Sequence, residues 1–190
     1  MINENGVLVR TGALAVSASL TKPADATAYT AGDIIANSLT ANLVVPLTFT
    51  LPRKSGRITG CRCVVTPASA NVVVTALDFD LLLFRPVASI PFADAGYPAD
   101  NTALPVSAAA MRELVATFRF AAGAWRNPAG GVTAGITGYQ AVPLGSSRVS
   151  AAVDVDGLAL SLLGVVQALG AWTPLAVVNV LDFALDIEFD

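Results

Sequence analysis

Apolar and polar residues alternate in steps of two along most of the chain. In the last segment Leu181, Phe183 and Leu185 alternate with Asp182 and Asp186. This period is typical of an antiparallel strand with one buried and one exposed face. Alternation or a short apolar run predicts strands at 14–20, 33–37, 45–51, 57–65, 73–83, 114–120, 139–144, 153–156, 162–169 and 181–189.

One segment has a helical pattern. Ser107 can cap a helix that continues through three alanines to Leu114. Alanine is the strongest helix former, and serine is a favoured N-cap residue. We therefore expect one short helix over 107–114, about two turns long.

Many short strands without alternating helices predict an all-β protein of the sandwich type. A jelly roll, an antiparallel β-sandwich with one short helix, fits the strand count. An immunoglobulin-type sandwich fits less well, because the expected spacing of cysteine, tryptophan and cysteine is missing. We expect an N-terminal arm at 1–12 and a single sandwich domain at 13–190. The longest predicted loops are 86–106 and 123–138.

The surface of this domain is expected to be poor in charge. The chain has 190 residues, of which 54% are hydrophobic and 13% charged, against about 25% charged in an average domain. Nine of the 11 basic residues are arginine, the basic residue that interfaces favour over lysine. Either the source has a compositional bias, or partners cover much of the surface.

Several function classes are excluded or disfavoured. The chain has no histidine, which removes Ser-His-Asp and Cys-His catalysis and most zinc sites. A net charge of −3 disfavours nucleic-acid binding. The uncharged stretch from 157 to 181 is interrupted by a turn signal at 170–174, so we expect no membrane span. The N-terminus does not resemble a secretory signal.

Acidic residues and cysteines offer little chemistry. Asp78 and Asp80 share one strand face, as do Asp182, Asp186 and Glu188. Regular strands space carboxylates too widely for a calcium site, so we expect a solvated face or pairing with arginine. We expect no calcium site at the aspartates at positions 154 and 156 either. The two cysteines, at 61 and 63, are expected to be small buried side chains. We therefore predict no catalytic residue, cofactor or metal.

A basic cluster at Arg53, Lys54, Arg57 and Arg62 holds four of the 11 basic residues within ten positions. On a turn between strands it would form a positive patch that could dock onto an acidic protein surface. A merely solvated turn is the other interpretation.

Three stretches together resemble the head decoration (cement) proteins of tailed bacteriophages. The first is Tyr29-Thr-Ala-Gly-Asp33-Ile-Ile, which is similar to a Tyr-x-Ala-Gly-Asp-Val motif of that family. The second runs from Leu81-Leu-Leu-Phe-Arg-Pro through Pro91-Phe-Ala-Asp to Asp100-Asn-Thr-Ala-Leu before the short helix. The third is the segment 162–174, which ends in Trp-Thr-Pro where the family often has Tyr-Thr-Pro.

The resemblance implies a jelly-roll subunit, commonly a homotrimer, on the outer surface of an icosahedral capsid. It would be made in the host cytoplasm, and its partner would be the major capsid protein, neighbouring copies of which it clamps together. The arm and the basic turn are our candidates for capsid contact. The candidate residues are Asn5, Val7, Val9, Arg10, Arg53, Lys54 and Arg57.

Two alternatives stay open at this point. A jelly-roll module that binds glycans, in a fibre or tail-associated domain, would use loop aromatics, for which Tyr97, Trp125 and Tyr139 are available. A carboxylate-pair hydrolase would need Asp94 and Asp100 as its acid and base. We expect no enzymatic activity, because neither histidine nor a nucleophile motif is present.

Overall fold

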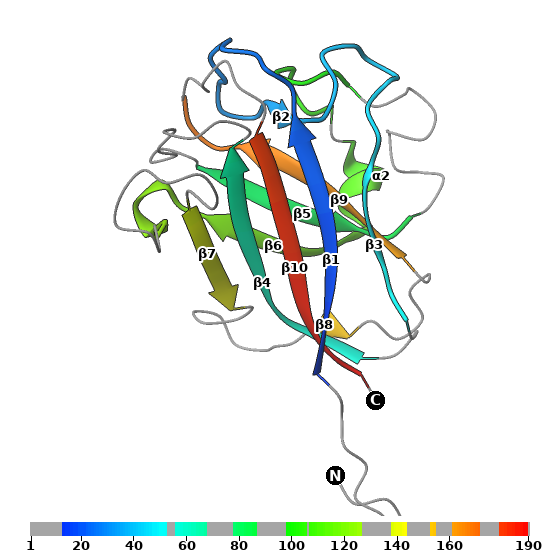
Figure 1. The fold of residues 1–190 in the computed structure, drawn as a ribbon. Coiled ribbons are helices and arrows are strands. Elements are labelled where there is room, and N and C mark those ends of the chain that lie inside the picture. Colours follow the sequence, from blue (N-terminus) through cyan, green and yellow to red (C-terminus); the bar gives the residue numbers. More distant parts are fainter. Residues whose placement is uncertain are drawn as a thin grey trace, which may run out of the picture.

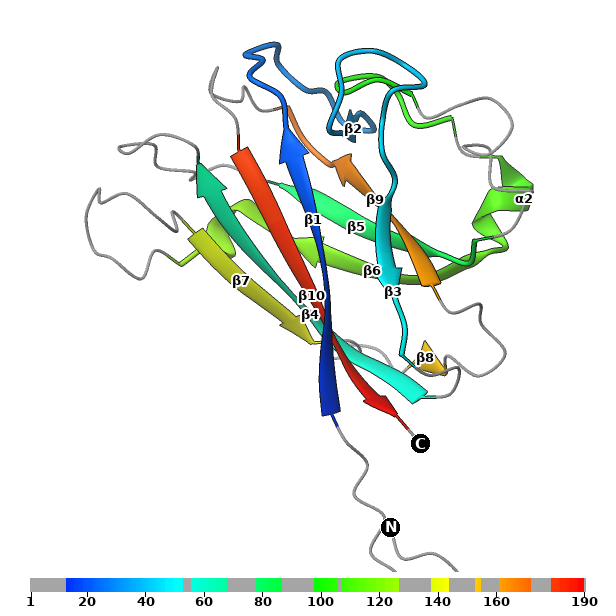
Figure 2. The same ribbon diagram turned by 45° about the vertical axis from the view of Figure 1, so that its right-hand side comes forward.

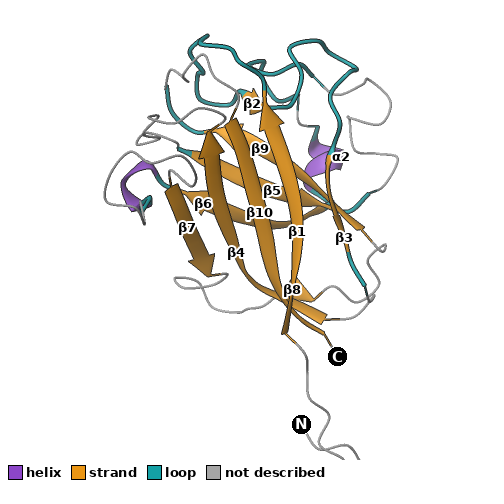
Figure 3. Ribbon diagram, viewed as in Figure 1, coloured by secondary structure: helices purple, strands orange, loops and turns teal. Residues whose placement is uncertain are grey.

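The structure is a computed structural model that describes residues 13–52, 56–67, 78–86, 98–105, 107–126, 138–143, 153–154, 161–171 and 179–189. Strands dominate these residues (Figure 3). The elements are β1 (Ala13–Lys22), β2 (Ile34–Ile35), β3 (Leu47–Thr50), β4 (Gly56–Pro67), β5 (Phe79–Phe84), α2 (Ala108–Met111), β6 (Leu114–Phe120), η1 (Ala122–Ala124), β7 (Gly138–Pro143), β8 (Val153–Asp154), β9 (Ser161–Ala168) and β10 (Asn179–Phe189).

The described strands form two antiparallel sheets packed face to face (Figures 1 and 2). One sheet has the order β1-β10-β4-β7, with β8 also paired to β4. The other has the order β2-β9-β5-β6, with β3 also paired to β9. The pairs are nested, β1 with β10, β3 with β9, β4 with β7 and β5 with β6, as if one long hairpin had been rolled up. This is jelly-roll connectivity, and it confirms the predicted fold class.

The core lies between the sheets and is built from the inward residues of the predicted alternation. Phe79, Phe120 and Phe183 are fully buried, and the rings of Phe79 and Phe120 meet that of Phe183 edge to face at 6.1 and 5.9 Å. Cys61 and Cys63 are buried and free, as expected. Burial raises the pKa of both thiols, so they behave as small apolar side chains.

A second apolar cluster covers the outer face of the β5 sheet. Leu82 and Phe84 point away from the main core, yet both are buried, against Ile34, Ala36 and Val165. The expectation of a half-buried strand with a solvated outer face is therefore wrong for the second half of β5. The chain that follows β2 and the segment around Leu104 pack over this face and exclude water from it.

The predicted helix is shorter than expected. Ser107 caps it, since its Oγ accepts a hydrogen bond from the Ala110 N–H at 3.1 Å. The helix ends at Met111 instead of Leu114, because Leu114 pairs with Phe84 in the sheet. Strand pairing thus outweighs the helix propensity of this segment. No helix in the described part of the chain is long and apolar enough to cross a membrane.

Candidate functional site

The structure brings the base of the predicted arm and the basic turn to one end of the sandwich. Across three neighbouring strands, Ala13 lies opposite Glu188, and Glu188 lies opposite Arg57. We call this the arm end; β1 begins and β10 ends there in Figure 1. Arg57 is exposed, and its other register neighbour is Asp154 of β8. It therefore stands between two acidic positions and is no part of a purely positive patch.

Arg57 is the one capsid-contact candidate that lies within the described residues. The other six candidates lie outside the described residues: Asn5, Val7, Val9, Arg10, Arg53 and Lys54. The expected arm, Asp94 and the Trp-Thr-Pro end of the third motif lie outside them as well.

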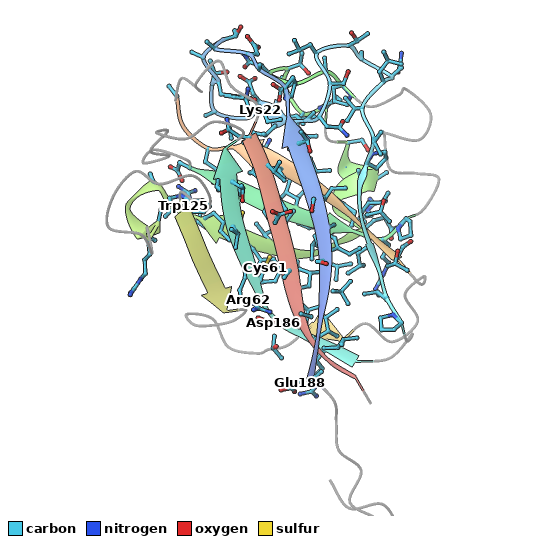
Figure 4. All side chains as sticks on the ribbon, viewed as in Figure 1. Lys22, Cys61, Arg62, Trp125, Asp186 and Glu188 are labelled. Atoms are coloured by element: carbon cyan, nitrogen blue, oxygen red, sulfur yellow. The ribbon has the colours of Figure 1, made fainter. Side chains whose placement is uncertain are left out.

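The outer face of the β1 sheet carries paired charges. Arg62 bonds Asp186 at 2.8 Å, with both side chains partly exposed (Figure 4). Ser19 donates a hydrogen bond to Asp182. On the other sheet Arg119 pairs with Asp78 at 2.8 Å. Burial raises the pKa of the neighbouring Asp80, and Arg119 opposes that rise. The expectation that arginine pairs with these strand carboxylates is confirmed at both places.

The opposite end of the sandwich holds a buried polar cluster, which we call the Lys22 cluster (Lys22, Tyr29, Asp33, Asp100 and Asn101). Lys22 is only 1% exposed, and its label in Figure 4 marks this end. Its Nζ donates hydrogen bonds to the carbonyls of Pro23 and Asp25, each at 2.9 Å. It also lies 3.9 Å from an oxygen of Asp100 and 5.8 Å from the centre of the Tyr29 ring. These contacts compensate an ammonium group that is withdrawn from water.

Asp100 is the acceptor at the centre of the Lys22 cluster. The Tyr29 hydroxyl donates to both of its oxygens, at 2.7 and 2.8 Å, and the Ala36 N–H donates at 2.7 Å. Burial raises the pKa of Asp100, whereas these donors and Lys22 lower it. Burial also lowers the pKa of Lys22, and the charge of Asp100 opposes that shift. The group therefore ties three chain segments together, and its carboxylate is occupied by the fold.

The cluster explains the residues of the Tyr-Thr-Ala-Gly-Asp stretch. Gly32 has a φ of 99°, which favours glycine. The Asp33 carboxylate accepts hydrogen bonds from the N–H and hydroxyl of Thr30, at 2.6 and 2.8 Å. The backbone of Asp33 also forms an isolated antiparallel β-bridge with Ala103, which lies in the segment that follows Asp100. The turn at 29–33 therefore contacts the Asp100-Asn-Thr-Ala-Leu part of the second motif.

The second motif supplies the residues that contact this turn from the other side of the Lys22 cluster. Asn101 has a φ of 58°, a conformation that asparagine tolerates better than most residues. Its side-chain N–H donates to the Ala28 carbonyl at 3.1 Å. The backbone groups of Asn101 and Thr102 bond those of Ile34 at 2.9 and 2.8 Å. Two stretches that resemble the same family, about 70 positions apart, therefore form one structural unit.

Sequence reasoning missed an exposed apolar loop beside this cluster. The loop joins β2 to β3 and presents Leu39, Leu43 and Val45 at 53%, 68% and 67% exposure. The sequence does contain an indication of an apolar surface here, because residues 34–52 include no charged side chain. The alternation of apolar and polar residues did not predict this loop, because alternation identifies strands and says nothing about which side chains a loop exposes.

The loop aromatics give limited support to a glycan site. Trp125 is half-buried and stacks on Phe120 with ring centres 6.1 Å apart. Tyr139 lies on strand β7, opposite Val64, which confirms the strand predicted at 139–144 and contradicts its place among the loop aromatics. Tyr97 lies outside the described residues.

Comparison with known proteins identifies no family. No family model matches the chain. No curated protein matches it either. One solved structure, the decameric BFDV capsid protein, is similar at a TM-score of 0.34 and 11% identity, over 94% of this chain and 98% of that one. A TM-score at this level is too low to carry an argument about fold or function.

Proposed function

We propose that the protein is a non-enzymatic structural virion protein that binds the outer surface of an icosahedral phage capsid. In this proposal it acts as a homotrimer that clamps neighbouring copies of the major capsid protein. The observation that carries the proposal is the meeting of the two motifs in the Lys22 cluster. The resemblance to head decoration proteins thereby covers a folded unit of a jelly roll, and not scattered short matches.

The arm end is the proposed capsid-facing surface. The start of β1 and Arg57 lie at the same end with only Glu188 of β10 between them, so arm and basic turn can contact one partner together. A protein that binds only the assembled lattice stabilises it by mass action. Three linked copies multiply weak individual contacts, because the second and third bind at high effective concentration.

The test is co-sedimentation of the purified protein with empty heads that lack it. The proposal expects saturable binding at a fixed ratio to the major capsid protein. Deletion of residues 1–12, or Arg57→Gln, should weaken binding about tenfold, as loss of an interface anchor does. The matched control is Arg112→Gln, an exposed arginine at the end of α2. A folded protein that never binds heads would overturn the proposal.

The glycan-binding alternative predicts a different result. A purified sample that ignores heads but binds a glycan array would favour it. The stacking of Trp125 on Phe120 leaves that side chain little free ring surface, so the geometry supports this alternative less well.

A further inference from the structure

The β2–β3 loop exposes apolar side chains although it is firmly built. The Val45 N–H donates to the Asn37 side chain at 2.9 Å, and the Thr40 N–H donates to the Ser38 hydroxyl at 3.1 Å. The Ser38 carbonyl accepts from the Asp100 N–H at 2.8 Å, which anchors the loop to the Lys22 cluster. The apolar side chains are thus presented by a preorganised loop, and its ordering adds little entropic cost to binding.

A shallow apolar hollow lies at the base of this loop. Its walls include Leu20, Ile35, Val44, Val45, Leu47 and Val166, and its volume of about 20 Å³ is close to the room that a single water molecule needs. Each of these lining side chains is apolar. The hollow is too small to take a partner's side chain, so the contact surface consists of the exposed side chains of Leu39, Leu43 and Val45.

Charge indicates which partner fits. Residues close to a rotation axis of a homo-oligomer meet their own copies, so a charged group there faces a like charge. The loop and its flanks, 34–52, carry no charge. The neighbouring Lys22, Asp33 and Asp100 are buried, and Asp25, beside Lys22, is partly exposed. On the outer face of the β1 sheet, by contrast, Glu188 is exposed and Asp182 and Asp186 are partly exposed. Of these two described surfaces, the loop is therefore the better suited to meet its own copy.

We propose that a second copy of this chain covers the β2–β3 loop, which places Leu39, Leu43 and Val45 beside the symmetry axis of a homo-oligomer. The inference rests on the self-association part of the proposed function and not on capsid binding. It assigns the two ends of the sandwich different partners, the arm end the capsid and the loop end another subunit.

The first experiment measures the mass of the purified full chain by sedimentation equilibrium at micromolar concentrations. We expect an oligomer, and Leu43→Asp or Val45→Asp should weaken self-association about tenfold or more. Both side chains are exposed, so the folded monomer should survive, as circular dichroism can verify. The control is Leu14→Asp, which places the same charge on an exposed leucine at the arm end.

A second measurement reads proximity to the axis directly. Thr40→Cys should form a disulfide between copies under mild oxidation, because Cys61 and Cys63 are buried and do not compete. Ser17→Cys, on the exposed sheet face, should not. An oligomer that tolerates both aspartate variants and does not cross-link at position 40 would overturn this surface and leave self-association standing. A monomeric wild-type protein would overturn both, while co-sedimentation still decides capsid binding.

Discussion

Lys22 shows how a single buried charge can hold loops in place. Its ammonium group closes the turn after β1 through two carbonyls and faces Asp100 from a different part of the chain. Breaking a buried pair leaves one charge without compensation, which is more costly than losing the pair.

A double-mutant cycle tests this coupling. Lys22→Met and Asp100→Asn should each lower the free energy of unfolding by about 3 kcal/mol, because each leaves a buried group without its partner. The double variant should lose about 1–3 kcal/mol less than the sum. Urea denaturation measures all four proteins. Additive losses would show that the two groups do not interact.

The raised pKa of Asp100 makes a second prediction about pH. The folded carboxyl holds its proton at a higher pH than the unfolded one does. Protonation of Asp100 therefore stabilises the folded protein. This stabilisation is complete below the ordinary aspartate pKa and is lost as the pH rises through the raised pKa of the folded state. Wild-type stability should then increase relative to Asp100→Asn as the pH falls from neutral toward the ordinary aspartate pKa of about 4. Thermal unfolding of both proteins across this range gives the difference, and a constant difference would contradict the prediction.

The Lys22 cluster could not be predicted from the sequence. A lysine at the end of a strand and an aspartate before an asparagine both look like exposed turn residues. They are buried because three loops from different parts of the chain close over one end of the sandwich. The alternation rule describes which face of a strand is covered, but it contains no information on which loops meet.

At the scale of elements, the fit between β3 and β9 depends on Gly164. A Cβ at this position would lie 2.8 Å from a terminal methyl of Leu47 and 3.1 Å from the ring of Phe49. Both neighbours are buried, so they have little room to move.

Gly164→Ala should therefore destabilise the protein by about 1–3 kcal/mol through overpacking. The double variant Gly164→Ala with Leu47→Ala should recover part of that loss, because it removes the methyl that clashes. Chemical denaturation compares these proteins with Leu47→Ala alone. If alanine at 164 leaves stability unchanged in the wild-type background, β3 and β9 are not closely packed there.

Most strands could be predicted, because their alternation matches the sheet that forms. The segments 14–20, 57–65, 139–144, 162–169 and 181–189 each overlap a strand of the structure within a few residues. The errors occurred where tertiary contacts change the local pattern. Phe84 is buried on a face that looked solvated, and pairing with Leu114 shortens the helix.

At the scale of the whole molecule, the nested pairing places Arg57 and the start of β1 at one end and the Lys22 cluster at the other. Sequence alone could not show this, because it depends on Ala13, Glu188 and Arg57 lying on adjacent strands. The result is a molecule with two ends of different chemistry. The arm end carries charges at its surface, whereas the loop end exposes Leu39, Leu43 and Val45 and buries Lys22, Asp33 and Asp100.

The two proposed interfaces should therefore respond differently to salt. Raising the ionic strength from about 0.1 M to 1 M shortens the screening length from about 10 Å to 3 Å. Binding of the arm end to heads should weaken, because Arg57 acts there through an exposed charge. Self-association through the loop should persist, because burial of leucine and valine does not depend on charge. Co-sedimentation and sedimentation equilibrium, run on one sample series, measure both. If salt dissociates the oligomer and leaves head binding intact, the assignment of the two ends is reversed.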